Sequence, residues 1–252
     1  MEGLRKPFQG VTNIIRFNWH FYAIAFAVLL LLGGMASLFG KPLCLVIYFI
    51  MNVLLLTILI SLLTSYYIYD VSDFYLLKWM EHNNSESLIV NIHAGFDETS
   101  HLIQNKFNNA ELIVLDFYNP QKHTEPSIQR ARKAYPPFPT TQQIITTSIP
   151  LHDHSVDKLF VILSAHEIRN SQERLLFFNE LHRVLKPSGQ LYITEHLRNL
   201  PNFIAFNIGF FHFFSKKSWI KIIKEAHFKI QKTEKLNPWI TNFILTKNGT
   251  TL

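Results

Sequence analysis

Charged side chains are missing from two long stretches near the start of this 252-residue chain. Residues 17–40 and 42–69 contain no Asp, Glu, Lys or Arg, and both are almost wholly apolar. A helix of about 20 apolar residues can cross the hydrocarbon core of a bilayer, where every backbone group needs an internal partner. We therefore expect two transmembrane helices, at about 17–40 and 42–69. Two buried helices of a soluble protein would give the same pattern, whereas a cleavable signal peptide would have a shorter apolar region.

The turn between the two stretches is short, so the spans should form an antiparallel hairpin with both chain ends on one side. Arg5, Lys6 and Arg16 precede the first span, and only Lys41 lies in the turn. The positive-inside rule then predicts an integral membrane protein whose larger part faces the cytoplasm. The net charge of +6 suits contact with anionic membrane lipids. No nucleic-acid partner is expected, because no compact Lys/Arg cluster with interleaved aromatic residues is present.

Cysteine is nearly absent as well. The single one, Cys44, falls inside the second apolar stretch, which excludes an intramolecular disulfide framework and a cysteine-based metal site. The chain has 12 histidines but no HExxH or similar spacing. The sequence alone therefore predicts no metal site, and it leaves the oligomeric state open.

The composition changes after residue 70 and divides the chain into three parts. Residues 1–70 form the expected membrane anchor, 71–86 a connector and 87–252 a domain of alternating strands and helices. We expect strands at 87–92, 111–117, 142–147, 156–163 and 190–196, and helices at 98–107, 126–135, 171–185 and 218–226. Runs at 228–236 and 239–247 can pair as an antiparallel hairpin at the edge. This pattern predicts an α/β fold, a doubly wound, Rossmann-like, mostly parallel sheet with an antiparallel edge strand.

Glycine is scarce where an α/β protein would hold a nucleotide-like cofactor. The stretch VNIHAGFDETS, residues 90–100, follows the first strand and has one glycine, Gly95. Ligands of such sheets gather at the carboxyl ends of the strands, and polar residues follow four of the predicted strands. The candidate cofactor-binding residues are Asn91, His93, Gly95, Asp97, Asp116 and Ser164. The candidate catalytic residues are His166, Glu167 and Glu195.

These residues distinguish between two classes of cofactor, namely S-adenosylmethionine and dinucleotides such as NAD. Asp116 ends the second strand, where a carboxylate can accept hydrogen bonds from ribose hydroxyls, as in sites for NAD or S-adenosylmethionine. Asp97 and Glu98 stand at the start of the next helix, where they would repel a pyrophosphate. S-adenosylmethionine has no phosphate and carries positive charge, so the acidic helix start favours it. Asp97 could equally be a plain helix cap.

The residues also resemble a known family. The stretch from Ile149 to His196 contains RVLKPSG, residues 183–189, and is similar to class I S-adenosylmethionine-dependent methyltransferases of the ubiquinone/menaquinone-biosynthesis-like, type 11 group. The resemblance covers roughly Ser87 to the end of the chain. The family usually has an acidic residue followed by alternating glycines in its cofactor loop. Here Asn91 replaces the acid, His93 the first glycine and Asp97 the last.

The resemblance implies methyl transfer from S-adenosylmethionine, with His166 as the best-placed base and Glu167 and Glu195 near it. Each of the three could instead pack at the rim or pair with Arg169 or Arg198. The aromatic segment 199–219 could form an apolar lid, with Lys216 and Lys217 at lipid headgroups. We therefore expect a membrane-anchored methyltransferase acting on a small, lipophilic acceptor. The altered glycine loop leaves an alternative, a catalytically inactive, membrane-bound module that binds a partner.

Overall fold

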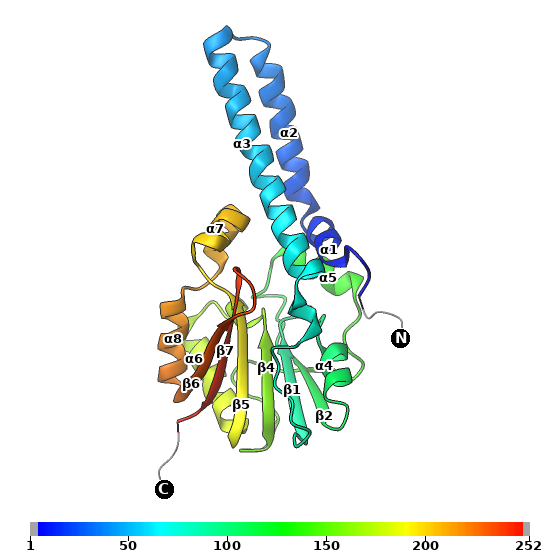
Figure 1. Cartoon of the computed structure of the whole chain (residues 1–252), viewed down its shortest axis with the longest axis vertical. Coiled ribbons are helices and arrows are strands. Elements are labelled where there is room, and N and C mark those ends of the chain that lie inside the picture. Colours follow the sequence, from blue (N-terminus) through cyan, green and yellow to red (C-terminus); the bar gives the residue numbers. More distant parts are fainter. Residues whose placement is uncertain (1–4, 249–252) are drawn as a thin grey trace.

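A long helical hairpin stands on an α/β domain in the computed structural model, which describes residues 5–248 (Figure 1). The N-terminal helices are α1 (Gln9–Phe17), α2 (Trp19–Ala36) and α3 (Lys41–Tyr66). Asn18 separates α1 from α2, so the first predicted span begins two residues later than expected. Gly40 is extended before α3, and Pro42 occupies the first turn, where its missing N–H has no helical partner to lose.

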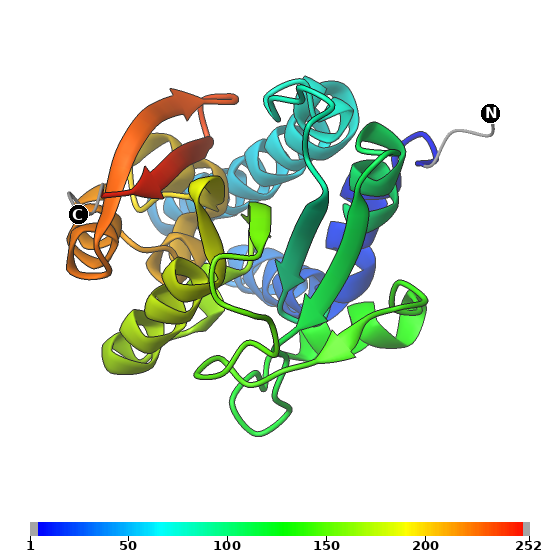
Figure 2. The same cartoon turned by 90° about the horizontal axis from the view of Figure 1, so that it is seen from below.

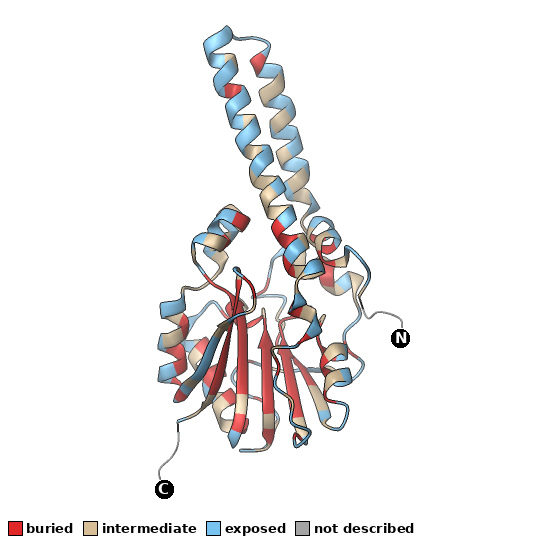
Figure 3. Ribbon diagram, in the orientation of Figure 1, coloured by how far each residue is buried: buried red, intermediate tan, exposed pale blue. Residues whose placement is uncertain are grey.

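The apolar side chains of this hairpin are largely exposed. Figure 3 shows α2 and α3 mostly pale blue and tan, whereas the central strands of the sheet are mostly red. By length and composition both helices could cross a membrane, and only 6% of each apolar window is buried. This exposure does not fit the alternative of two buried helices in a soluble core. A short π-helical turn, η1 (Tyr67–Val71), ends the second arm.

The sheet has seven strands in the order β3-β2-β1-β4-β5-β7-β6. They are β1 (Leu88–His93), β2 (Glu111–Asp116), β3 (Gln142–Gln143), β4 (Val156–Ile162), β5 (Leu185–His196), β6 (Phe228–Lys235) and β7 (Ile240–Lys247). The first five are parallel, and β7 runs antiparallel between β5 and β6. The predicted fold class, with its antiparallel strands at one edge, is confirmed.

Two strands differ in length from the prediction. The strand expected at 142–147 is only two residues long, because the chain turns back between Ile145 and Ser148. In contrast, β5 begins at Leu185 rather than residue 190. Leu185 pairs with Val156, and the register then shifts before Gln190. Pro187 and Gly189 lie within this irregular stretch, where the ladder needs no N–H from proline.

Helices cover both faces of the sheet, as the view from below shows (Figure 2). The helices of this domain are α4 (Ser100–Lys106), α5 (Pro126–Ala134), α6 (Ser171–Val184), α7 (Leu200–Phe206) and α8 (Lys216–Glu225). Short 3₁₀ turns are η2 (Asp73–Leu76), η3 (Ala165–Glu167) and η4 (Asn207–His212). One apolar cluster includes Phe177 and Phe178 of α6 and Trp219 of α8. The other includes Phe74 and Met80, so the segment expected as a connector packs against the sheet.

The base of the hairpin is joined to the rim of the sheet. Asp70 accepts hydrogen bonds from the N–H groups of Gly10 and Val11, at 2.7 and 2.8 Å, and so caps α1. At the other end of α1, Phe17 meets Phe96 and Tyr135 edge to face. The sequence analysis did not identify α1 as a separate helix. Its position brings the carboxyl ends of β1 and β2 beneath the hairpin.

Candidate active site at the carboxyl rim of the sheet

The parallel strands end beneath the hairpin. The last residues of β1, β2 and β5 are His93, Asp116 and His196, and all three are buried. The Tyr69 hydroxyl, from the base of the hairpin, lies 3.0 Å from His196 Nε2. The rim on which the sequence placed its candidate residues is therefore the part of the domain closest to the hairpin.

Asn91 and Asp97 brace the loop after β1. The amide of Asn91 donates to the hydroxyls of Ser100 and Thr99, at 2.8 and 3.1 Å. Asp97 Oδ1 accepts from the backbone N–H groups of the same two residues, each at 2.9 Å. The Asp97 bonds satisfy backbone donors at the start of α4, as a helix cap does, and the Asn91 bonds hold the two hydroxyls in place. Both side chains therefore direct polar atoms at their own loop.

His93 and Gly95 form the turn of this loop. The Gly95 N–H donates to His93 Nδ1 at 3.1 Å, so the proton of a neutral His93 ring sits on Nε2. Nε2 is buried and has no hydrogen-bond partner in the described part of the chain. Burial lowers the pKa of His93, although Asp97 and Asp116 nearby act in the opposite direction. His93 is thus a neutral ring with one unused donor at the rim.

The backbone conformation at position 95 requires a glycine. Its φ is +93°, and a Cβ built there would lie 2.9 Å from Tyr118 Cδ2 and 3.0 Å from Arg132 Nη1. A side chain would be strained in this conformation and would press on both neighbours. The one family glycine that the loop retains therefore stands where the chain packs closely against Tyr118 and Arg132.

Asp116 is wholly buried, and both of its oxygens are in use. Oδ1 accepts from the Tyr118 N–H at 2.8 Å, and Oδ2 accepts from Arg132 Nη1 and Gln143 Nε2, each at 2.6 Å. Arg132 also lies over the Tyr118 ring. Gln143 is exposed and the Arg132 side chain is about one-third exposed, so both can rotate away. In this conformation both oxygens of Asp116 are therefore paired with groups of the protein itself.

The candidates after β4 fall into two groups. Ser164 donates to the carbonyl oxygen of Ile92 at 3.1 Å and ties the ends of β4 and β1 together. His166 Nδ1 donates to Glu195 Oε2 at 2.6 Å, and His166 Nε2 lies 3.4 Å from Glu167 Oε1. The structure therefore brings His166, Glu167 and Glu195 into one group.

The ionisation of this group bears on its chemistry. Burial would lower the pKa of His166, but Glu195 and Glu167 raise it to about 10. Burial would likewise raise the pKa of Glu167, whereas hydrogen bonds from His166 and His212 lower it. A His166 ring that carries both protons cannot accept another, so at neutral pH the proton acceptors here are carboxylates.

Two arginines near this group bond to backbone atoms. Arg169 donates to the carbonyl oxygens of His166 and His212, and Arg198 donates to those of Phe211 and Phe213. The expected alternative of side-chain pairing with Arg169 or Arg198 is therefore not how the candidate carboxylates are satisfied. Both arginines instead fix η4 against the rim.

Sequence reasoning missed Arg132 and His212. Arg132 lies in the last turn of α5, where a basic residue is common for dipole reasons alone. His212 lies in the aromatic segment, far along the chain from His166, and its Nε2 is 3.4 Å from Glu167 Oε1. A residue supplied by a distant segment leaves no spacing signal, so no pattern in the sequence could have found either one.

Comparison with known proteins identifies the domain. Residues 90–193 match the family model described as a methyltransferase domain. The fold is similar to that of a protein from Pyrococcus horikoshii OT3, with a TM-score of 0.51 and 15% identity over 69% of this chain and 86% of that one. For a SAM-dependent methyltransferase from Aquifex aeolicus the TM-score is 0.49, with 16% identity over 68% of this chain and 86% of that one. No curated protein matches this chain.

At 15% identity, the Pyrococcus horikoshii structure shows a shared fold and nothing more. The match to the methyltransferase domain indicates the enzyme class. This class is the S-adenosylmethionine-dependent methyltransferases, and the cofactor is S-adenosylmethionine.

Proposed function

We propose that this S-adenosylmethionine-dependent methyltransferase is anchored in a membrane and methylates a small, lipophilic acceptor. One observation carries the proposal, the position of the aromatic segment. Helix α7 lies beside the lower part of α3 (Figure 1). The segment that includes α7 and η4 exposes large apolar side chains, namely Leu200, Phe203, Ile204, Ile208 and Phe211. Apolar surface therefore continues from the hairpin to the edge of the candidate active site.

The hairpin supports anchoring through its surface. Leu31, Leu45 and Phe49 are each 65% or more exposed, and most of their neighbours in α2 and α3 are also apolar. Monomeric soluble proteins rarely expose a contiguous apolar patch larger than a few hundred Å². A bilayer around α2 and α3 would cover this surface and would place the rim of the sheet at the membrane boundary. The basic residues before α2 favour the cytoplasmic side.

The roles of the rim residues follow from their positions. The cofactor supplies a methyl group already activated on a sulfonium, so the protein mainly has to align it with the acceptor and exclude water. Asp116 would hold the ribose hydroxyls, and the backbone around Gly95 would border the cofactor. Glu167 and Glu195 lie on the acceptor side, where a carboxylate could take the proton of a hydroxyl. The aromatic residues of η4 would contact an apolar acceptor.

The inactive alternative also has a specific observation in its favour. Arg132 and Gln143 occupy the Asp116 oxygen that a ribose would need. If they never release it, the domain would keep the fold and lose the cofactor. The two possibilities differ in one measurable property, the affinity of the full-length protein for S-adenosylhomocysteine.

Isothermal titration of the detergent-solubilised protein with S-adenosylhomocysteine tests the cofactor site. We expect saturable binding that Asp116→Ala weakens by about 1.5–3 kcal/mol, the range for a hydrogen bond to a charged group. Arg132→Met should bind at least as tightly as the parent, because it removes one of the two side chains that donate to Asp116 Oδ2. Lys133→Met, an exposed cation one residue further along α5, is the matched control. Absence of binding in both the parent and Arg132→Met would establish the inactive module.

The acceptor is tested separately. The protein, reconstituted in vesicles made from a total lipid extract, is supplied with methyl-labelled S-adenosylmethionine. The proposal expects label in the organic phase, and less of it when Phe203 and Phe211 are both changed to Ser. Label that remains in water-soluble products in both samples would contradict a lipophilic acceptor while leaving the cofactor assignment intact.

A further inference from the structure

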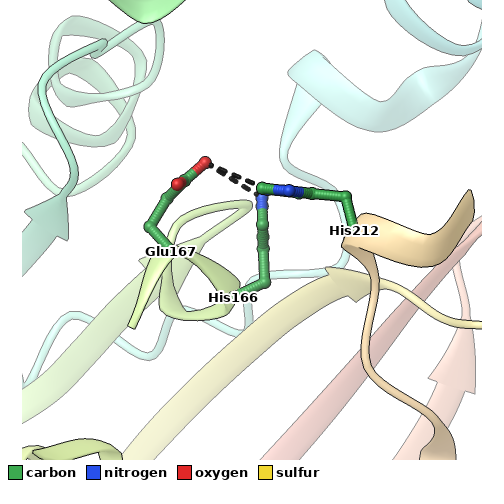
Figure 4. Close-up of side chains that lie close together, drawn as sticks. All are labelled: His166, Glu167 and His212. Atoms are coloured by element: carbon green, nitrogen blue, oxygen red, sulfur yellow. Dashed lines mark ion pairs between the residues drawn. The ribbon is translucent and has the colours of Figure 1, made fainter. Parts of the chain in front are cut away.

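Three potential metal ligands meet at the acceptor side of the rim. Figure 4 shows the side chains of His166 and Glu167, from η3, converging with that of His212, from η4. One ligand atom from each lies within 4.8 Å of the other two. Two imidazoles and one carboxylate form a donor set that zinc and similar divalent transition metals accept.

The separations fit a common ion. Glu167 Oε1 lies 3.4 Å from His166 Nε2 and 3.4 Å from His212 Nε2. Ligands at about 2.1 Å from a tetrahedral ion are about 3.4 Å apart, because the tetrahedral angle fixes that ratio. Both histidine nitrogens therefore stand at the distance from the carboxylate oxygen that tetrahedral coordination requires.

Both imidazoles are also oriented by a second carboxylate. His166 Nδ1 donates to Glu195 at 2.6 Å, and His212 Nδ1 lies 3.2 Å from Glu125 Oε1. A metal-bound histidine almost always donates its other ring N–H to such a partner, which fixes the ring and raises its basicity. His166 Nδ1 is engaged in this way, and His212 Nδ1 lies within ion-pair distance of Glu125, so the Nε2 atoms of both rings remain for Glu167.

The charge around the cluster favours a cation. Three carboxylates, those of Glu125, Glu167 and Glu195, surround two imidazoles. The nearby Arg169 is directed at the carbonyl oxygens of His166 and His212. The side chains of Glu167 and His212 are 19% and 27% exposed, so an ion can enter from solvent.

We propose that His166, Glu167 and His212 bind one divalent transition-metal ion of the zinc type, which displaces the Nε2 proton of His166 to solvent, with Glu195 and Glu125 as positioning residues. The bound ion links η4, and with it the aromatic segment 199–219, to η3 at the end of β4. Three protein ligands leave a fourth position, which an oxygen of water or of an acceptor can occupy. The ion-binding site does not depend on the identity of the acceptor or on cofactor binding.

Titration with zinc alone tests the proposal. The tag-free, full-length protein in detergent is dialysed against a chelator and then titrated with Zn²⁺, without cofactor or acceptor. We expect one equivalent of saturable binding, confirmed by elemental analysis. His212→Ala and Glu167→Gln should each weaken it by more than about 100-fold, and Glu195→Gln by about 10–100-fold, as for other groups that orient a ligand. Co²⁺ should give the visible absorption of a four-coordinate site with nitrogen and oxygen ligands.

His152→Ala is the matched control, because His152 is an exposed histidine elsewhere on the same domain. It should leave zinc affinity unchanged. Melting of each variant without metal verifies that it folds, and the partly exposed His212 provides a test even if a change at buried His166 prevents folding. Zinc affinity in His212→Ala and Glu167→Gln equal to that of the parent would overturn the proposal, and so would absence of binding in the parent. S-adenosylhomocysteine titration of the same samples reports separately on the cofactor site.

Discussion

The hairpin and the sheet domain use the same apolar residue types in opposite ways. Leu56, near the middle of α3, is 55% exposed, whereas Leu191, in the middle of β5, is fully buried. The hairpin is apolar on all sides, as expected for a helix surrounded by lipid. In the sheet domain the apolar residues cluster on both faces of the strands and on the inner faces of the helices. The difference supports the proposed anchor, in which lipid would surround the hairpin while the sheet domain is stabilised by its own core.

The largest expected effect comes from placing a charged side chain in each of the two regions. Leu191→Asp places a charge in the core of the sheet and should prevent folding, because an unpaired buried charge costs several kcal/mol. Leu56→Asp should leave the sheet domain folded but weaken membrane insertion by about 2.5–3.5 kcal/mol, the cost of a charge at the centre of a spanning helix. Membrane flotation and S-adenosylhomocysteine binding measure the two properties.

A hairpin surrounded by water would respond differently. In that case Leu56→Asp would raise the solubility of the protein and remain without effect on its fractionation. That result would remove the anchor from the proposed function and leave the methyltransferase domain unaffected.

The glycines of the hairpin and of the sheet domain also differ in their surroundings. Gly95→Val, in the sheet domain, forces a branched side chain into a positive φ and against Tyr118. We expect a loss of about 2–4 kcal/mol of stability, with loss of S-adenosylhomocysteine binding. Gly34→Val, in the hairpin, should cause no comparable loss, because a Cβ at Gly34 has no atom within 4 Å. Thermal melting of both variants gives the comparison, and equal losses would contradict it.

The fold was largely predictable from the sequence. The alternation of β-rich and helical runs gave the parallel sheet, and the RVLKPSG stretch pointed to the family. These signals are local, so they survive without knowledge of tertiary contacts. β3 was overestimated because apolar residues such as Ile144 and Ile145 continue the strand pattern into a turn.

The site was predictable only as a rim. The strand ends located His93, Asp116 and His166 correctly on one edge of the sheet. The partners of these residues come from elsewhere, since Arg132 lies on α5 and His212 on η4. Tertiary packing sets those contacts, and one sequence carries no record of them. Asp116→Ala should lower stability as well as cofactor affinity, because it leaves Arg132 and the Tyr118 N–H without their acceptor.

Helix α1 packs against η1 at the base of the hairpin, where it joins the sheet domain. A Cβ at Gly10 would collide with Cβ of Tyr69 and lie about 3 Å from the Asp70 carboxylate. Gly10→Ala should therefore push α1 away from η1 at a cost of about 1–3 kcal/mol, the range for overpacking. We expect faster proteolysis between α1 and α2 in the solubilised protein. Gly209→Ala, whose Cβ would have a neighbour only at 3.7 Å, is the control and should be cleaved like the parent.

The smallest expected effect lies at the end of the sheet domain farthest from the hairpin. Asp157 accepts hydrogen bonds from Lys186, from Ser87 and from the Leu88 N–H, and so joins β4 to the start of β1. Burial would raise the pKa of Asp157, but these bonds lower it from 3.8 to about 2. Because the folded-state pKa lies below that of the unfolded chain, the carboxylate stabilises the fold at pH values above about 4. That contribution is lost as the pH falls toward 2.

Asp157→Asn should therefore cost about 1 kcal/mol at pH 7 and less at pH 3, where the unfolded parent also binds a proton. Denaturant unfolding of the solubilised protein at pH 7, 5 and 3 measures the difference between parent and variant. Asp153→Asn is the control, since Asp153 pairs with Arg183 at the surface and its loss should make no measurable difference. A deficit for Asp157→Asn that stays constant from pH 7 to pH 3 would show that the variant disturbs packing rather than a charged hydrogen bond. The hairpin should be unaffected in either case, because it is charge-free along nearly its whole length.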